Sequence, residues 1–297
     1  YEYADIIVRA ILPAFLYFLG IFLGVHFKAK KLGLVGLKRE ELPKWKLLLP
    51  KIYLLLPLIV LTWMVVAGQT MAKSAIYGTI VAIVVGIINK DDRMTPSKFV
   101  NGLENGGKNC LSVGIACGMA GIIAGVVTMT GLGQVLIGAI VGLSNGHLII
   151  ALVLTMLCCI VLGMGVPTTA NYIIMATTCA PILASGMGLN LMAAHMFCFY
   201  FGIVADITPP VALAAYAGSA IAKAPPMKTA WNSTRLAIAA FIIPYIFAYN
   251  NALIFVGSDV KFLSVASIVI SATLGMASIA SGLMGYLIRD MKWISRI

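Results

Sequence analysis

Two short segments combine helix-breaking residues with oxygen-bearing side chains inside long apolar runs. Residues 163–172 read GMGVPTTANY, and residues 206–210 read DITPP. Interrupted membrane helices free carbonyl oxygens that, with hydroxyl and carboxylate oxygens, can bind Na⁺, while the N-termini of half-helices favour a substrate carboxylate. The two segments therefore predict one half of an ion and substrate site. Its candidate residues are Gly163, Gly165, Pro167, Thr168, Thr169, Asn171, Asp206, Thr208, Pro209 and Pro210.

Asp206 carries the most weight in this prediction, because an ionisable residue within a membrane segment is a functional candidate by default. A helix cap for the half-helix that begins near Thr208 is the alternative role, and the two roles are compatible. Gly and Pro alone would be weak evidence, since both are common in membrane helices. The candidate Na⁺ ligands are Gly163, Gly165, Thr168, Asp206 and Thr208.

Other polar residues give weaker signals. His195 is either a proton carrier or a hydrogen-bonded histidine of the helix bundle, and Tyr172, like Asn171, either contacts substrate or packs. The six cysteines lie in apolar runs without zinc-site spacing, so we expect them to pack. No Ser-His-Asp grouping, HExxH, Walker or Rossmann motif is present, so the sequence does not predict an enzyme. A lipid-modifying membrane enzyme and a purely structural subunit are lesser alternatives.

The composition indicates an all-α polytopic membrane protein that must position these residues in the bilayer. The chain has 297 residues, 61% hydrophobic and 10% charged, with mean hydropathy +1.01, whereas soluble domains are about 25% charged. The net charge of +11 does not point to nucleic acid, because most Lys and Arg residues form four clusters. The positive-inside rule makes these clusters cytoplasmic. They lie in residues 28–51, 90–108, 223–235 and 289–296.

The alternation of basic loops and apolar runs fixes the predicted crossings. It places the N-terminus outside, the C-terminus in the cytoplasm, and residues 28–46 on the cytoplasmic surface. A re-entrant hairpin over 148–185, with its tip at 163–169, enters from outside, and a broken helix over 191–222 crosses inward. Neither pair of arms is long enough for two full spans. The other predicted crossings are 6–27, 48–67, 71–88, a bent one over 109–143 interrupted by TGLG at 130–133, 235–252 and 263–288.

Three segments around these motifs resemble a known transporter family. They are GMGVPTTANYIIMATTCAPIL (163–183), AAHMFCFYFGIVADITPPVALAAYAGSAIA (193–222) and AFIIPYIFAYN (240–250). They look like the C-terminal half of the large membrane subunit of tripartite ATP-independent periplasmic (TRAP) transporters. The opening AILPAFLYFLGIFLGVHFKAKKLGL (10–34) is also similar. The closest type has fused small and large subunits and works with a TAXI-type periplasmic binding protein.

The resemblance implies an elevator fold of the ion-transporter superfamily, of which this chain holds one inverted repeat. Residues 1–104 would be scaffold helices and a basic loop, 105–222 the moving transport region, and 223–297 further scaffold. The other repeat and the small subunit would precede Tyr1. The implied function is Na⁺-coupled import of an organic acid delivered by the binding protein, across a bacterial or archaeal inner membrane, with no cofactor besides Na⁺. A binding-protein-independent Na⁺/dicarboxylate symporter is the alternative.

Overall fold

The computed structural model describes residues 3–36, 42, 45–257 and 260–291, and its regular elements there are all helices. An isolated bridge between Tyr286 and Asp290 is the one strand-like pairing in these ranges. The prediction of an all-α chain is confirmed. The elements are α1 (Tyr3–Lys31), α2 (Trp45–Leu48), η1 (Leu49–Leu55), α3 (Leu56–Val66), α4 (Met71–Ile88), α5 (Pro96–Thr130), α6 (Leu132–Ser144), α7 (Leu148–Gly163), α8 (Thr168–Thr178), η2 (Ile182–Gly186), α9 (Leu191–Val204), η3 (Ala205–Ile207), α10 (Leu213–Ala222), α11 (Pro226–Ala237), η4 (Ile238–Ile242), α12 (Ile243–Tyr249), η5 (Asn251–Ile254) and α13 (Phe262–Met284).

Four helical segments of the described chain are long and apolar enough to cross a membrane, namely α1, η1 with α3, α4 and α13. Helices α5 and α6 meet at an angle of 73° at Gly131, whose left-handed φ of 67° ends α5 where TGLG predicts an interruption. Large apolar side chains point outward, as on α1, where Phe15, Phe18 and Phe22 are 57%, 70% and 63% exposed. Such faces suit contact with lipid, and the chain is a multi-pass membrane protein.

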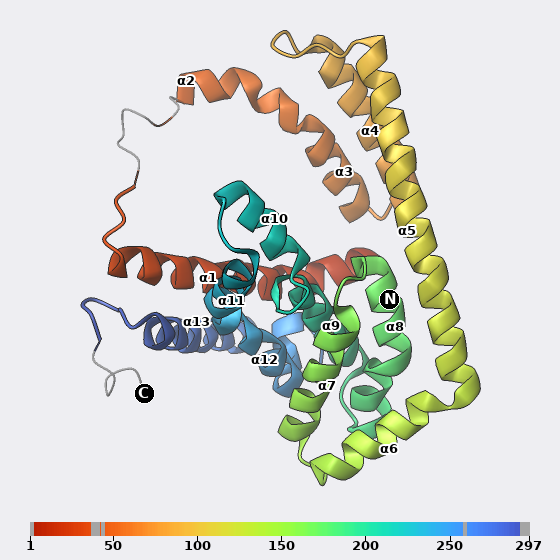
Figure 1. Cartoon of the computed structure of the whole chain (residues 1–297), viewed down its shortest axis with the longest axis vertical. Coiled ribbons are helices and arrows are strands. Elements are labelled where there is room, and N and C mark those ends of the chain that lie inside the picture. Colours follow the sequence, from red (N-terminus) through yellow and green to blue (C-terminus); the bar gives the residue numbers. More distant parts are fainter. Residues whose placement is uncertain (1–2, 37–41, 43–44, 258–259, 292–297) are drawn as a thin grey trace. The chain divides into compact units, whose positions relative to one another are not determined.

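The chain divides into two compact units, one of Tyr1–Ile11 with Leu34–Cys110 and the other of Leu12–Gly33 with Leu111–Ile297. In the first unit, α3 and α4 pack against each other as a helical hairpin (Figure 1). The Thr70 hydroxyl caps the start of α4. The Lys51 ammonium lies 2.6 Å from the Asp91 carboxylate just past the end of α4, and its hydrogen bond lowers the pKa of Asp91.

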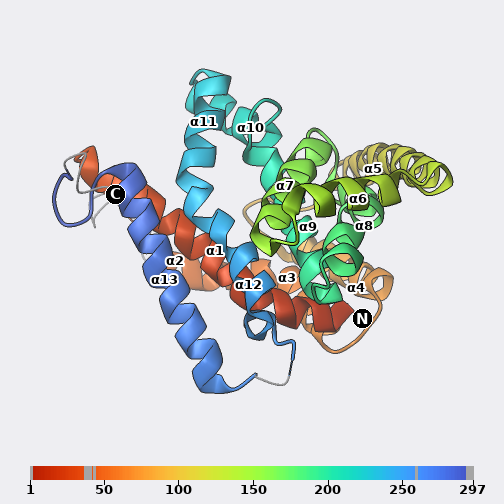
Figure 2. The same ribbon diagram turned by 90° about the horizontal axis from the view of Figure 1, so that it is seen from below.

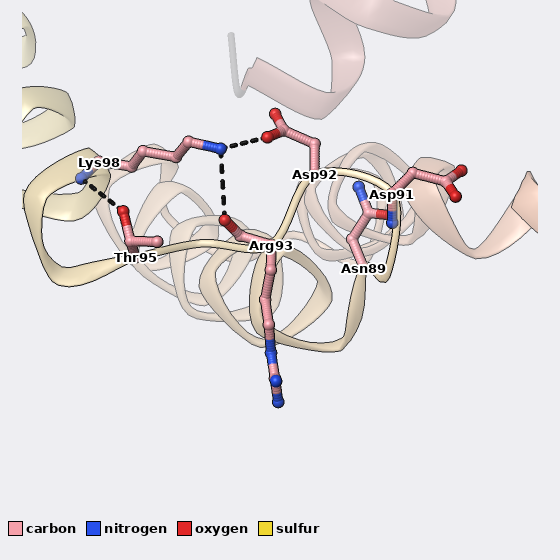
Figure 3. A network of polar contacts seen from close by, with 6 residues as sticks. All are labelled: Asn89, Asp91, Asp92, Arg93, Thr95 and Lys98. Atoms are coloured by element: carbon pink, nitrogen blue, oxygen red, sulfur yellow. Dashed lines mark hydrogen bonds and ion pairs between the residues drawn. The ribbon is translucent and has the colours of Figure 1, made fainter.

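The basic loop that follows α4 is ordered by its own polar contacts (Figure 3). The Lys98 side chain pairs with the Asp92 carboxylate and donates to the Arg93 carbonyl, 3.3 Å away. The backbone N–H of Lys98 donates to the Thr95 hydroxyl at 3.3 Å, which caps the start of α5. A charged segment suited to an aqueous surface thus precedes α5.

Helix α9 is central to the second unit, with α7, α8 and α12 packed against it (Figures 1 and 2). Phe197 and Phe201 of α9 are fully buried, with ring centroids 4.8 Å apart. Tyr245 of α12 meets both rings edge-on, at 5.5 and 5.9 Å. On another side, Tyr200 packs edge-on against Tyr17 of α1 at 5.5 Å. Aromatic contacts therefore hold α9 against α12 and α1.

Free cysteines also lie in this unit. Cys159, Cys179 and Cys198 are buried in the core between α7, α8 and α9, and the chain's six cysteines are all free thiols. Their burial among apolar side chains agrees with the expected packing role.

The predicted crossing over 235–252 is not one continuous α-helix. Helix α11 ends at Ala237, a 3₁₀ turn follows, and α12 begins with Pro244 at its second position. Proline has no N–H and clashes with the preceding turn, so it is tolerated in the first turn of a new helix but not in the interior of an old one. The hairpin's second arm also departs from a plain helix, since the π-turn η2 follows α8.

We predict that Phe201→Ala lowers the free energy of unfolding by about 3–5 kcal/mol, because it empties a fully buried ring site. Thermal unfolding of the purified protein in detergent measures the change. Phe18→Ala is the matched control, since the Phe18 ring is 70% exposed and its loss leaves no cavity. Equal destabilisation by both substitutions would contradict the position of α9 in the core.

Candidate functional site

The first interruption separates α7 from α8 and follows from its residue types. Helix α7 ends at Gly163, and Met164 turns to extended backbone with φ −64° and ψ 117°. Gly165 has a left-handed φ of 74°, a conformation that glycine adopts without steric cost. Pro167, with ψ 144°, is the N-cap of α8. The prediction that GMGVPTT interrupts the helix is confirmed.

Gly163 lies at a very close contact between the interrupted segments. A Cβ atom added there would lie 2.8 Å from Nδ2 of Asn171, 2.9 Å from Cβ of Ala205 and 3.1 Å from the carbonyl oxygen of Gly202. These residues belong to α8, η3 and α9 respectively. The end of α7 can therefore approach all three elements only because position 163 has no side chain.

Asn171 joins two of these elements through one half of its amide. Its Nδ2 donates to the carbonyl oxygen of Gly202 at 3.1 Å, and the residue is only 3% exposed. Its Oδ1 is buried and has no hydrogen-bond donor among the described residues. An unsatisfied buried acceptor costs roughly 1–3 kcal/mol. This orphaned oxygen belongs to the residue whose Nδ2 meets Gly163, and it has the chemistry of a cation ligand.

The second interruption is stabilised by neighbouring helices. After η3 the backbone is extended at Thr208, with φ −103° and ψ 128°. The hydroxyl of Thr234 in α11 donates to the freed carbonyl of Ile207 at 2.8 Å, and the hydroxyl of Tyr216 in α10 donates to the Pro210 carbonyl. Backbone groups released at membrane depth need such partners. Protein contacts therefore satisfy two carbonyls of the DITPP segment.

The two interruptions adjoin each other. Gly163 faces Ala205, and a Cβ on Gly165 would lie 3.5 Å from Cγ1 of Val211. Asp206 follows Ala205 directly, is half-buried, and has no hydrogen bond or ion pair among the described residues. The structure thus brings the backbone of both motifs together, and Asp206, next in the chain to this contact, has a carboxylate without a partner among the described residues.

The hydroxyl groups of the two motifs differ in their surroundings. Thr168 and Thr169 are exposed in the first turn of α8, and their side chains have no hydrogen-bond partner among the described residues. The Thr208 hydroxyl donates to the Val204 carbonyl at 2.8 Å, which leaves its oxygen able to accept. Pro209 and Pro210 fall in the non-helical segment between η3 and α10. Membership of these residues in a Na⁺ site remains a prediction.

His195 and Tyr172 form a pair between α9 and α8. The Tyr172 hydroxyl and His195 Nδ1 are 2.9 Å apart, and the Phe199 ring meets Tyr172 edge-on at 5.6 Å. This contact favours the interpretation of His195 as a hydrogen-bonded histidine of the bundle.

Sequence reasoning missed two residues of this region. Gly202 accepts the Asn171 bond, and a Cβ there would lie 2.9 Å from the Met175 sulfur. A lone glycine within an apolar helix often marks a close approach, so this signal was available. Thr234 lies 27 residues from its partner Ile207 and belongs to another helix. Nothing local predicts that contact.

Comparison with known families now identifies the chain. The family model described as "Tripartite ATP-independent periplasmic transporter, DctM component" matches residues 1–262, and thus both interruptions. The chain belongs to this family. A search of curated proteins and a search of solved structures each found no match. The DctM match confirms the resemblance to the large membrane subunit of TRAP transporters and makes the chain a permease component.

We predict that Gly163→Ala lowers the free energy of unfolding by about 1–3 kcal/mol, because its methyl group overlaps Asn171 and Ala205. The substitution keeps the carbonyl oxygen, so it tests the close contact separately from ion binding. Thermal unfolding in detergent is the measurement, with Gly138→Ala in α6 as control, since a Cβ there meets no atom within 4 Å. Wild-type stability of Gly163→Ala would show that the contact is looser than described.

Proposed function

We propose that this DctM-family chain is the permease subunit of a Na⁺-coupled secondary TRAP transporter that imports an organic acid. The family assignment supports the transporter class, and it implies association with a substrate-binding protein and a small membrane subunit. The binding protein is of the TAXI type, and the small subunit is fused to the large one. The protein resides in the inner membrane of a bacterium or archaeon, with its C-terminus in the cytoplasm.

One observation carries the proposal of ion coupling, namely that the two interrupted helices meet at Gly163. A backbone break is expensive in the bilayer unless it is buried in protein or lines a polar cavity. Here two breaks adjoin, Asn171 at their contact has an unsatisfied amide oxygen, and Asp206, the residue after Ala205, has a carboxylate without a partner among the described residues. Two helix kinks without a shared function would not require these unpaired oxygens.

The donor set suits Na⁺ by its chemistry. Carbonyl oxygens at the end of α7, the Thr208 hydroxyl, the Asp206 carboxylate and the orphaned oxygen of Asn171 are all hard ligands, which alkali ions prefer over sulfur or imidazole. Among the described residues, no three His, Cys, Asp or Glu side chains cluster in a way that could hold a metal ion. The ligands proposed are Gly163, Gly165, Thr168, Asp206 and Thr208, to which Asn171 is added.

The organic acid would bind beside the ion. Helix α8 begins at the junction, where its first N–H groups have no partner within the helix and its dipole favours an anion. Thr168 and Thr169 are exposed in that first turn and supply hydroxyl donors to a carboxylate. Na⁺ bound at the break would add positive charge and so couple the two ligands.

We predict that Asp206→Asn and Thr208→Val each weaken Na⁺ binding at least about tenfold, which corresponds to roughly 1.4 kcal/mol per lost ligand. Asp206→Asn removes the charge at constant size, and Thr208→Val removes one oxygen. Isothermal titration of the purified protein with NaCl against choline chloride measures the affinity. Uptake by proteoliposomes supplied with the binding protein, with and without a Na⁺ gradient, gives the functional readout.

The matched controls for this experiment are Asp92→Asn in the basic loop and Thr128→Val, whose hydroxyl bonds only to its own helix. Both should bind Na⁺ as the wild type does. Unchanged Na⁺ affinity in Asp206→Asn and Thr208→Val would remove these residues from the site. Uptake independent of the Na⁺ gradient in the wild type would overturn Na⁺ as the coupling ion.

The proposed orientation gives a separate prediction. In intact cells, a cysteine at position 261, before α13, should react with a membrane-impermeant maleimide, whereas one at position 90, after α4, should react only after the cells are opened. Lys261→Cys and Lys90→Cys are made in a chain whose exposed Cys110 is replaced by Ser. The parent chain without either cysteine is the control. Labelling of position 90 from outside would reverse the orientation.

A further inference from the structure

A basic cavity lies in the second unit where residues of α1, α11 and α13 meet. It has a volume of about 380 Å³ and is lined by Lys28, Lys228, Asn232, Arg235, Leu236 and Met284. These residues come from the last turn of α1, from α11 and from the end of α13. Three of the six carry a positive charge and none is acidic.

Hydrogen bonds fix the cavity at the ends of two membrane-spanning helices. Lys31 Nζ in the last turn of α1 donates to the carbonyl oxygen of Met284 at 2.9 Å, and Arg235 Nη2 of α11 donates to the carbonyl oxygen of Leu283 at 2.8 Å. Helices α1 and α13 are both long enough to span, and both end here. The cavity therefore lies at the level where the hydrocarbon gives way to the headgroups.

Helix α11 has the composition of an interfacial helix. It carries Lys228, Trp231, Asn232 and Arg235 within 12 residues, and the Trp231 side chain is 63% exposed. Tryptophan with Lys or Arg is typical of the boundary between membrane and water. This agrees with the position that the ends of α1 and α13 indicate.

No acidic side chain in the described part of the chain pairs with the positive charges of the cavity. The side-chain ammonium groups of Lys28 and Lys228 have no hydrogen-bond or ion-pair partner among the described residues. Arg235 uses one nitrogen for the Leu283 carbonyl, which leaves further N–H donors for another acceptor. Like charges held around one concavity repel each other, so an anion bound there would be stabilised.

We propose that this cavity binds the phosphodiester headgroup of an anionic phospholipid. Ammonium and guanidinium groups donate charge-assisted hydrogen bonds to phosphate oxygens, and the Asn232 amide adds a neutral donor. Leu236 and Met284 provide apolar contact for the glycerol and the first acyl carbons. Basic pockets between membrane helices on the cytoplasmic side suit such headgroups. The bound lipid would hold α1, α11 and α13 together at their ends.

The test compares Lys28→Gln/Lys228→Gln with wild type by native mass spectrometry. Each protein is released from nanodiscs of phosphatidylcholine containing phosphatidylglycerol. We expect wild type to retain phosphatidylglycerol selectively and the double variant to bind it about 25-fold more weakly, from roughly fivefold per lysine. Lys73→Gln/Lys261→Gln lowers the net charge equally outside the cavity and should behave as wild type. Inorganic phosphate at millimolar concentration tests a soluble ligand as the source.

The outcomes separate clearly. Selective retention that is lost only in Lys28→Gln/Lys228→Gln establishes the lipid site. Equal retention by that variant and wild type overturns it, and so does equal loss in both double variants, which would indicate diffuse surface charge. Displacement of the lipid by inorganic phosphate would assign the site to a soluble phosphate instead. Lipid retention does not depend on Na⁺ binding, so this experiment tests the lipid site separately from the proposed transport function.

Discussion

The second unit depends on the contact that Gly163 allows between the end of α7 and the Asn171–Gly202 hydrogen bond. That bond ties α8 to α9, and the missing side chain at position 163 brings α7 against both. A larger residue at position 163 would push the end of α7 away from α8, α9 and η3 at the same time. The contact also places the end of one broken helix beside the start of the gap in another, which is the geometry from which the proposed ion site is built.

Neighbouring helices satisfy backbone groups that the second break releases and hold α9 in place. Thr234 and Tyr216 donate to carbonyls of the DITPP segment, and aromatic rings from α12 and α1 hold α9 in place. Elsewhere the chain meets lipid with exposed apolar faces, as along α1. Near the breaks, side-chain hydrogen bonds thus join different elements, whereas the hydroxyl groups along the span α13 donate to carbonyls of their own helix.

Local residue types predicted most of the helices and the interruptions at TGLG, GMGVPTT and DITPP. Gly131, Gly165 and Pro167 mark real breaks, because a left-handed φ or a missing N–H acts within one turn of the chain. The split of 235–252 was missed although Pro244 signalled it, because residues 236–249 form one run without a charged residue. The Asn171–Gly202 bond spans 31 residues and the Thr234 contact spans 27, and such pairings arise from packing that a single sequence does not encode locally. Asp206 stands out in the sequence as an ionisable residue within an apolar run, and its role as a Na⁺ ligand stays a prediction.

The length of α7 has a consequence for the energetics of ion movement. Its 16 residues rise about 24 Å, less than the roughly 30 Å of hydrocarbon in a bilayer. With the proposed topology, a cation held at its C-terminal end has entered the membrane's electric field without leaving on the other side. Crossing the whole field is worth about 2.3 kcal/mol per charge at 100 mV. Arrival of Na⁺ alone would draw a share of that energy, so ion binding would be electrogenic. Movement of the protein loaded with one Na⁺ and one carboxylate would carry no added net charge, so the membrane voltage would act mainly on the ion-binding step.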